Sequence, residues 1–194
     1  MKNVLDLIRP LLTFDSKDDF YYLQVLQRKK ENPQLGSNSR VIKNYYINSI
    51  EYLENRFSEI EELCNTFNAR AMLRLNKRSY EKVAFRAMVN MANVLSNKEF
   101  KFSNKVYDRA CGETHNDKNK KWIIDLDGDE VNYKDSIIEY INTLQPDGEK
   151  VYTILPTKNG IHIITKPFNR KEFGNKYPTV DIHCDNPINL FWKE

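Results

Sequence analysis

Trp122-Ile-Ile-Asp-Leu-Asp-Gly-Asp129 is an apolar run that ends in acidic residues. The run predicts a strand held in a hydrophobic core, and the end of that strand carries two carboxylates. Asp125 and Asp127 alternate along it, so both side chains lie on one face, about 7 Å apart along the backbone. Two like charges this close are costly unless a cation neutralises them, and carboxylate oxygens suit Mg²⁺ or Mn²⁺. The segment therefore predicts a metal site at a strand end, with a solvated acidic turn as the alternative.

Two other sites are compatible with an acidic segment of this kind. An EF-hand loop counted from Asp125 needs Gly at its sixth position and Glu at its twelfth, where this chain has Glu130 and Ser136. That possibility is excluded. A phosphatase with the pattern D-x-D-G would use Asp125 as its nucleophile, but it expects Thr next and a position near the start of the chain. Here Asp129 follows, so the phosphatase is kept as an alternative only.

Two later segments add residues of related chemistry. Thr157-Lys-Asn-Gly-Ile-His162 contains the turn signal Asn159-Gly160 between two apolar runs, which predicts a hairpin with His162 at the start of its second strand. Lys158 supplies a point charge suited to phosphate, and Gly160 allows the turn and a close approach of backbone N–H groups to a phosphate. Val180-Asp181-Ile182 predicts a further strand that carries an acidic residue.

Together these segments resemble the archaeo-eukaryotic primase (primase-polymerase) superfamily, in particular its small branch in phages and plasmids. That family carries D-x-D or D-x-E on one strand, a Ser/Thr-x-x-Gly-x-His hairpin, and an apolar-Asp-Ile strand often followed by another Asp. The resemblance covers residues 122–192, and the first half only through its general α/β order. The matching positions are Asp125 and Asp127, then Thr157, Gly160 and His162, then Asp181 and Asp185.

The resemblance implies a metal-dependent nucleotidyltransferase that makes primers or extends DNA or RNA on a single-stranded DNA template by two-metal phosphoryl transfer. It implies that the metal ligands and catalytic residues are Asp125, Asp127 and Asp181, and that the nucleoside triphosphate is bound by Thr157, Lys158, Gly160, His162 and His183. His183 is a departure, since relatives often have Arg or Lys there. A replication partner such as a helicase is a further expectation. The alternatives are a non-catalytic nucleic-acid or protein binding module on the same fold, and the phosphatase.

Contacts to nucleic acid are expected mainly at phosphates, because a primer-making enzyme accepts many sequences. The candidate residues are Arg28, Lys29 and Lys30 after the first strand, Arg70, Arg74, Lys77 and Arg78 on or near the third, and Tyr45 and Tyr46 as stacking residues. A stripe of Arg70, Arg74 and Lys77 on one side of the sheet would form a basic surface. Each of these residues is otherwise an ordinary solvated charge or a core aromatic.

Hydrophobic periodicity predicts the remaining elements and an α+β fold. We expect helices at 4–12, 49–67, 79–95 and 133–144, and strands at 20–27, 41–47, 69–75, 122–126, 151–155, 161–165, 179–183 and 188–192. The third helix is expected to bury Ala84, Met88, Met91 and Leu95. Residues 96–121 are polar and are expected to form a loop-rich boundary. By the resemblance, residues 1–100 form an N-terminal α/β half packed, as one compact unit, on an RRM-like catalytic half of antiparallel strands and helices at 101–194.

Composition limits the class of protein. The chain has 194 residues, 40% hydrophobic, with 30 Lys and Arg against 27 Asp and Glu. This is typical of a globular protein and excludes a histone-like polybasic one. Three cysteines and the lack of a long apolar run predict a cytoplasmic protein without a membrane segment. A zinc site from Cys111, His115, His183 and Cys184 is not expected, because the usual C-x₂-C spacing is missing.

Overall fold

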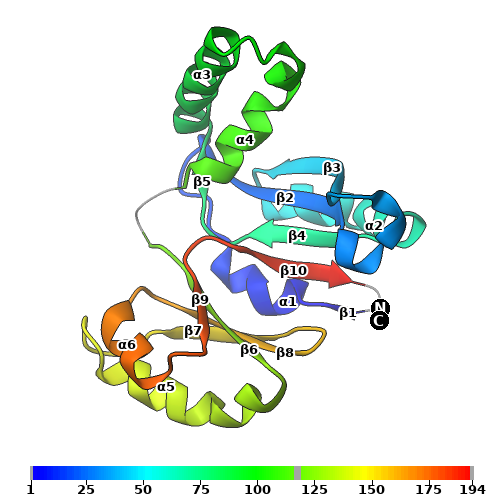
Figure 1. The fold of residues 1–194 in the computed structure, drawn as a ribbon. Coiled ribbons are helices and arrows are strands. Elements are labelled where there is room, and N and C mark those ends of the chain that lie inside the picture. The colour runs from blue at the N-terminus through cyan, green and yellow to red at the C-terminus, as the bar shows by residue number, and fades with distance from the viewer. Residues whose placement is uncertain (1, 116–118, 193–194) are drawn as a thin grey trace.

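Two antiparallel sheets form the protein, and helices cover both of them (Figure 1). The computed structural model describes residues 2–115 and 119–192, and six α-helices lie within this part of the chain. The α+β class expected from the sequence is confirmed. None of the helices in these residues is both long and apolar enough to cross a membrane.

The first sheet has the strand order β1-β10-β4-β2-β3, with β5 paired to β2. Its strands are β1 (Lys2–Asn3), β2 (Asp19–Gln27), β3 (Arg40–Ile47), β4 (Arg70–Arg74), β5 (Arg78–Ser79) and β10 (Pro187–Trp192). The short helix α1 (Leu5–Ile8) and the long helix α2 (Ile50–Thr66) pack on one face. Ser49 begins α2 as expected, because its hydroxyl accepts a hydrogen bond of 3.0 Å from the Tyr52 backbone N–H. Short 3₁₀ turns η1 (Arg9–Leu11), η2 (Lys29–Glu31) and η3 (Pro33–Leu35) connect these elements.

The second sheet has the order β7-β8-β6-β9. In chain order its elements are β6 (Trp122–Asp127), the 3₁₀ turn η5 (Gly128–Tyr133), α5 (Lys134–Thr143), β7 (Val151–Pro156), β8 (Gly160–Thr165), α6 (Arg170–Lys176) and β9 (Asp181–His183). Both helices pack on its outer face, where Ile124, Leu126 and Ile163 meet Ile141 and Phe173 in one core. The hairpin and the helix expected from the sequence are thus present, and α6 lies in a polar segment where no helix was predicted.

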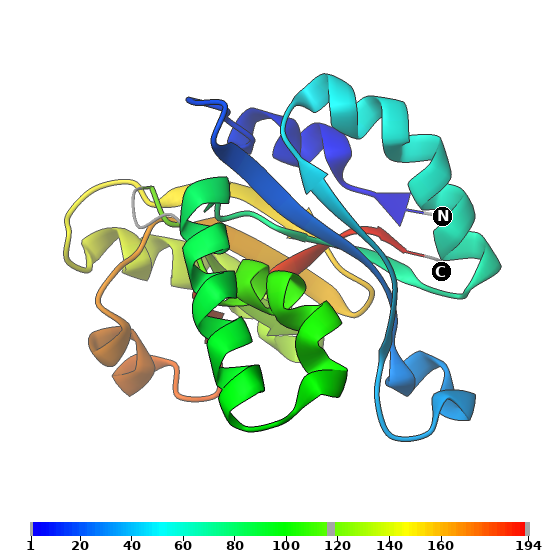
Figure 2. The same cartoon turned by 90° about the horizontal axis from the view of Figure 1, so that it is seen from above.

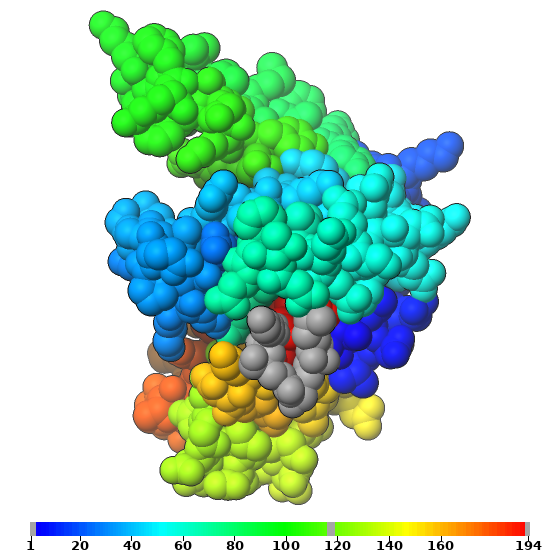
Figure 3. Space-filling model, turned by 90° about the vertical axis from the view of Figure 1, so that its right-hand side faces the viewer, coloured from blue at the N-terminus to red at the C-terminus, as the bar shows by residue number. Residues whose placement is uncertain are grey.

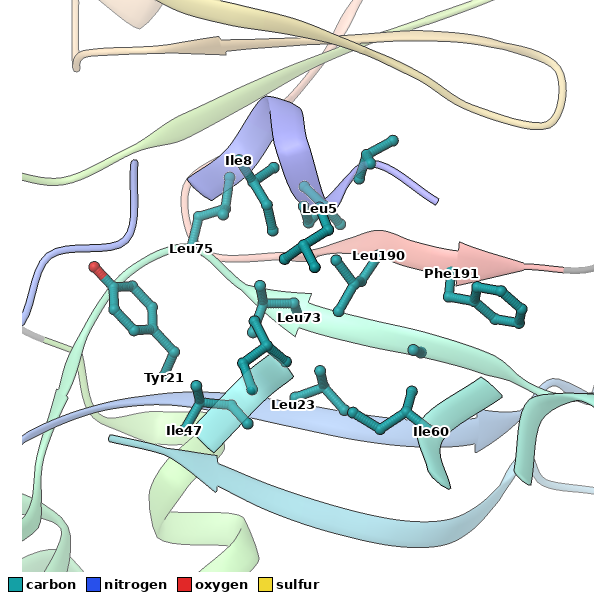
Figure 4. Packing of buried hydrophobic residues seen from close by; sticks show 14 of the residues in the cluster. Leu5, Ile8, Tyr21, Leu23, Ile47, Ile60, Leu73, Leu75, Leu190 and Phe191 are labelled. Carbon is teal, nitrogen blue, oxygen red and sulfur yellow. The ribbon is translucent and has the colours of Figure 1, made fainter. Parts of the chain in front are cut away.

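The inner face of the second sheet joins the core of the first. Ile123, Leu155 and Ile164 belong to the same buried cluster as Leu5 and Ile8 of α1. Figure 4 shows α1 seated over β10 and β4, with these two side chains pointing toward Leu73, Leu75 and Leu190. Helix α1 therefore fills the space between the sheets at one end of their contact.

The last strand of the chain lies in the first sheet. β10 pairs antiparallel with β4, with Ile188 opposite Leu73, and with β1, with Trp192 opposite Lys2. The expected halves, 1–100 and 101–194, therefore do not each contain one complete sheet: the C-terminal strand completes the N-terminal one.

A helical arm projects from the first sheet on the side away from the second (Figures 1 and 3). It consists of α3 (Tyr80–Ser96), the 3₁₀ segment η4 (Phe100–Lys105) and α4 (Val106–Glu113), and we call residues 80–113 the arm. The helix α4 was not predicted. The prediction of the buried face of α3 was wrong: Val83, Asn90 and Val94 are buried, whereas Met88 and Leu95 are exposed.

A cluster of polar groups around Asp185 ties the two sheets together. Arg78 is fully buried, and its guanidinium donates hydrogen bonds of 3.1 and 2.6 Å to the two carboxylate oxygens of Asp185. Arg74 lies 3.1 Å from the same carboxylate. Asn76 donates to Asp185, and also to the carbonyls of Lys121 and Cys184, each at 3.0 Å. The segments that enter β6 and leave β9 are thus fixed to β4 and β5.

We expect Asp185→Asn to destabilise the fold strongly. The substitution leaves the buried guanidinium of Arg78 without its counter-charge, and breaking one partner of a buried ion pair costs about 3 kcal/mol or more. Asp6→Asn is the matched control, since the Asp6 side chain is 93% exposed and forms a surface ion pair of 3.7 Å with Arg9. A surface pair of this kind contributes about 1 kcal/mol or less to stability. Urea unfolding of both variants measures the difference, and equal losses of stability would contradict this role for Asp185.

Candidate functional site

A cleft of about 530 Å³ lies between the first sheet and the inner face of the second. The wall from the second sheet is lined by Ile123, Asp125, Asp127, Thr157, Lys158, Asn159, His162 and His183. The opposite wall is lined by Arg28, Lys30, Glu31, Arg70, Met72, Asn186, Pro187 and Asn189. Seen from above, the segment between β2 and β3 and the arm stand on the same side of the first sheet (Figure 2). Most of the candidate site residues predicted from the sequence line this cleft.

The strand β6 delivers its carboxylates to the cleft because its inner face changes character along its length. Ile123 is 2% exposed and packs in the core, whereas Asp125 is half-buried and Asp127 is exposed at the end of the strand. All three side chains share one face, as alternation in a strand requires. The apolar end anchors β6, and the acidic end forms part of the cleft wall.

Asp125 lies at the centre of a group of acidic and imidazole side chains. In the sheet register it is opposite His162 on β8 and opposite Asp181 on β9. The Nε2 atom of His162 is 3.2 Å from Asp125 Oδ1, and that of His183 is 3.9 Å from Asp125 Oδ2. The hydrogen bond from His162 lowers the pKa of Asp125 below its ordinary value of 3.8, although burial acts in the opposite direction. Asp125 is therefore held as a carboxylate.

The hairpin between β7 and β8 is closed by Thr157. Its hydroxyl accepts a hydrogen bond of 2.9 Å from the Gly160 N–H, and its own N–H donates to the Gly160 carbonyl at 2.9 Å. Gly128 of the acidic segment donates its N–H to the Asn159 carbonyl at 3.2 Å, which fastens the hairpin to the end of β6. Lys158 is exposed at the tip and lines the cleft.

Gly160 is needed for a reason that the sequence did not suggest. A Cβ atom at this position would lie 1.9 Å from the Leu126 carbonyl oxygen and 2.9 Å from the Asp127 Cα. No side chain fits there, because the backbones of β6 and β8 approach too closely. From the sequence we expected this glycine to allow the turn and a close approach to phosphate. The close contact with β6 is by itself sufficient to require glycine at this position.

The opposite wall is basic. Arg70 is buried and forms an ion pair with Glu31, to which its Nε donates at 2.9 Å. Arg28 lies 3.8 Å from the same carboxylate, and Lys30 is exposed beside it. One glutamate therefore balances one of three cations, and a net positive charge faces Asp125 and Asp127 across the cleft.

Other basic and aromatic candidates lie outside the cleft lining. Arg74 and the fully buried Arg78 are bound to Asp185, and Lys77 is 9% exposed between Asp15 and Asp19. Arg70, Arg74 and Lys77 each have a carboxylate partner, so they do not form a stripe of unpaired cations. Tyr45 is buried in the core, and Tyr46 donates a hydrogen bond of 2.8 Å to Asp108. Asn186 and Asn189, which line the cleft, had no signal in the sequence.

Asp125, Asp127 and Asp181 suit a divalent cation by their chemistry, since all three offer carboxylate oxygens on or beside one face of the second sheet. Asp181 is exposed and lies across from Asp125 in the register, although it is not part of the cleft lining. In residues 2–115 and 119–192, no three His, Cys, Asp or Glu side chains are gathered closely enough to hold a metal ion. Asp125 faces two imidazoles instead. Of the four soft ligands considered for zinc, Cys111 is buried, which raises the pKa of its thiol to about 12.

Comparisons with protein-family profiles, with curated protein sequences and with solved structures found no match. Proposals about the cleft therefore rest on its own residues and on the fold that positions them.

We expect Gly160→Ala to destabilise the protein by about 2 kcal/mol, because overpacking of a close backbone contact costs about 1–3 kcal/mol. Gly112→Ala is the control: it lies in α4, and a Cβ there would meet nothing within 4 Å. In a helix this change stabilises by about 0.5–1 kcal/mol. Thermal or urea unfolding separates the two, and a neutral Gly160→Ala variant would show that β6 and β8 can move apart without cost.

The contact between Asp125 and His162 predicts a pH effect on stability. Because the pKa of Asp125 in the folded protein is below 3.8, ionised Asp125 stabilises the fold above that pH, and this contribution is lost as pH falls through the folded pKa. In His162→Ala, the pKa of Asp125 is expected to rise toward its ordinary value. Carboxyl NMR titration measures the pKa directly, and urea unfolding between about pH 6 and pH 2 should show a shallower acid loss in the variant. An unchanged pKa would contradict the role of His162.

Proposed function

We propose that this protein is a metal-dependent nucleotidyltransferase of primase-polymerase type, which makes primers or extends DNA or RNA on a single-stranded template. One observation carries the proposal: a single cleft presents Asp125 and Asp127 on one wall and Arg28, Lys30 and Arg70 on the other. Carboxylates that suit a metal and cations that suit phosphates are what transfer of a nucleotide requires.

The dimensions and charge of the cleft support a nucleotide as ligand. Its volume of about 530 Å³ falls within the range of about 300–1,000 Å³ found for small-molecule sites. Lys158 extends into it from the hairpin, opposite Arg28 and Lys30. These three side chains are placed to contact a polyphosphate from two sides, and Arg70, held by Glu31, adds a fixed positive charge behind them.

The topology of the second sheet also supports the proposal. The order β-α-β-β-α-β and the sheet order β7-β8-β6-β9 are compatible with the expected RNA-recognition-like arrangement of four strands and two helices. In this arrangement β6 and β8 are the two central strands, and they carry Asp125, Asp127 and His162. The resemblance seen in the sequence implies a catalytic half of this kind with these residues at its centre.

Asp125, Asp127 and Asp181 would hold Mg²⁺ or Mn²⁺ only if their side chains drew closer together, because in this structure they are not gathered closely enough for a metal ion. Such an ion supplies charge neutralisation to the attacking and leaving oxygens during phosphoryl transfer. The Nε2 atom of His162 lies 3.2 Å from Asp125 Oδ1 in this structure, so the imidazole and an ion would compete for the same carboxylate. The chain's own contributions are the orientation of Asp125 by the β6–β8 register and the binding of phosphates by Lys158, Arg28 and Lys30.

A second candidate is a module that binds a nucleotide or nucleic acid without turnover. It is favoured by the position of Asp125 beside two imidazoles, with His162 at 3.2 Å and His183 at 3.9 Å, which occupy the surroundings of the carboxylate where a metal would bind. Under this alternative the basic wall of the cleft keeps its role, and the acidic residues only hold the imidazoles in place.

We expect Asp125→Asn and Asp127→Asn to reduce nucleotide incorporation by at least about a hundredfold, since loss of a metal contact removes several kcal/mol of transition-state stabilisation. The assay follows labelled nucleotides added to primed and unprimed single-stranded templates with Mg²⁺ or Mn²⁺. Asp129→Asn is the matched control, because Asp129 is exposed in η5 and does not line the cleft.

The other outcomes identify the alternatives. Nucleotide binding without incorporation by the wild-type protein, across nucleotides and both metals, would favour the non-catalytic module. Hydrolysis of a phosphate monoester that depends on Asp125 would favour the phosphatase, with this carboxylate as nucleophile.

A further inference from the structure

The arm exposes an unusual amount of apolar surface. Six large apolar side chains lie open to solvent within 18 residues: Phe85 at 62%, Met88 at 67%, Val89 at 50%, Leu95 at 53%, Phe100 at 60% and Phe102 at 40%. Isolated exposed apolar residues are ordinary, whereas several of them in one short segment indicate a binding surface. We call these six residues the arm patch.

Helix α3 has two apolar faces, and the body of the protein uses only one. Val83 packs with Phe20, Tyr22 and Ala110 against the first sheet and α4. Phe85, Met88, Val89 and Leu95 follow the spacing of three, four and seven residues that places side chains on one side of a helix. That side is opposite the buried one, about half a turn away at 100° per residue. These four side chains of the arm patch therefore lie outside the buried cores of the described residues.

The border of the patch is mainly basic. Residues 80–105 contain five cations and only two glutamates, an excess equal to the net charge of +3 of the whole chain. The cations are Lys82, Arg86, Lys98, Lys101 and Lys105, and only Arg86 forms an ion pair, 3.1 Å from Glu113, in the part of the chain that is described. Lys101 lies over the ring of Phe102, 5.0 Å from its centroid. Such a border repels a second copy of itself and attracts a polyanion.

We propose that the arm patch binds single-stranded nucleic acid. Exposed phenylalanine rings provide stacking surfaces for bases, and the lysines between them lie where backbone phosphates would pass. Phe85, Phe100 and Phe102 supply the rings, while the aliphatic members of the patch contact bases and sugars. The combination of three exposed aromatic rings with a basic border favours a nucleic-acid strand over an apolar protein partner.

This inference rests on the proposed function for the identity of the strand, which is the template or the growing product. The first sheet lies between the arm and the second sheet (Figure 1), so the arm patch and the cleft are two separate sites on one molecule. A strand held at both is retained between nucleotide additions by contacts that take no part in the chemistry.

The test measures fluorescence anisotropy of a labelled oligo(dT) of about 20 nucleotides, longer than the site of one small binding domain. Phe85→Ala together with Phe100→Ala should weaken binding about tenfold or more, since each stacked base contributes on the order of one factor of ten. Leu7→Ala is the control, because Leu7 is 45% exposed but lies in α1. Both phenylalanines are exposed, so unfolding by urea should match that of the wild type.

A second variant tests the phosphate contacts. Lys98→Ala with Lys101→Ala should lower the slope of log affinity against log salt by about 1.4, which corresponds to two phosphate contacts on a single strand. Unchanged affinity in the phenylalanine variant, or an unchanged slope in the lysine variant, overturns the proposal and leaves the patch to a protein partner. A wild-type dimer that Phe85→Ala converts to a monomer in light scattering overturns it as well.

Failure of the proposed function would look different. If Phe85→Ala with Phe100→Ala weakens oligo(dT) binding while the wild type incorporates no nucleotide, the arm patch is supported and the polymerase is not. If nucleotides are incorporated and the arm variants bind oligo(dT) as tightly as the wild type, the polymerase is supported and the arm patch is not.

Discussion

The guanidinium of Arg78 is entirely removed from water, and a charge in that position must be neutralised within the protein. Asp185 neutralises it from the short segment between β9 and β10, where the chain passes from the second sheet to the first. Asn76 bonds to the same carboxylate and to the carbonyls of Lys121 and Cys184, so the entrance to β6 and the exit from β9 meet at one point. This contact joins the two sheets directly before Asn186 and Pro187, which line the cleft.

One face of β6 is apolar and buried at one end of the strand and acidic and partly exposed at the other, and the acidic end lines the cleft. At one end Ile123 packs with α1 between the sheets, and two residues later the same face presents a carboxylate to solvent. The cross-strand neighbours of Asp125 then determine its chemistry: His162 on one side and Asp181 on the other. An imidazole keeps the carboxylate ionised, and a second carboxylate adds the charge that a cation would neutralise.

Sequence patterns within one segment predicted the helices and turns that form within that segment. Helix α2 follows from Ser49 and a regular apolar stripe, and the hairpin of Thr157 and Gly160 follows from its turn residues. The buried face of α3 was not predictable in the same way, because the helix is apolar on two sides and periodicity does not distinguish them. The partners of Arg70 and Lys77 lie 39 and 58 or more residues away in the sequence, so no local spacing could show that these cations are paired.

The position of β10 has a consequence for the order in which the protein folds as it is synthesised. The strand lies between β1 and β4, so the first sheet lacks an inner strand until residues 187–192 have left the ribosome. Until then β4 presents an open edge of unpaired backbone groups, which is a template for wrong pairing. The second sheet takes its strands only from residues 122–183, so its formation does not depend on residues 187–192. The N-terminal part of the chain is thus made first and finished last, and a chain truncated before residue 187 contains every strand of the second sheet but lacks an inner strand of the first.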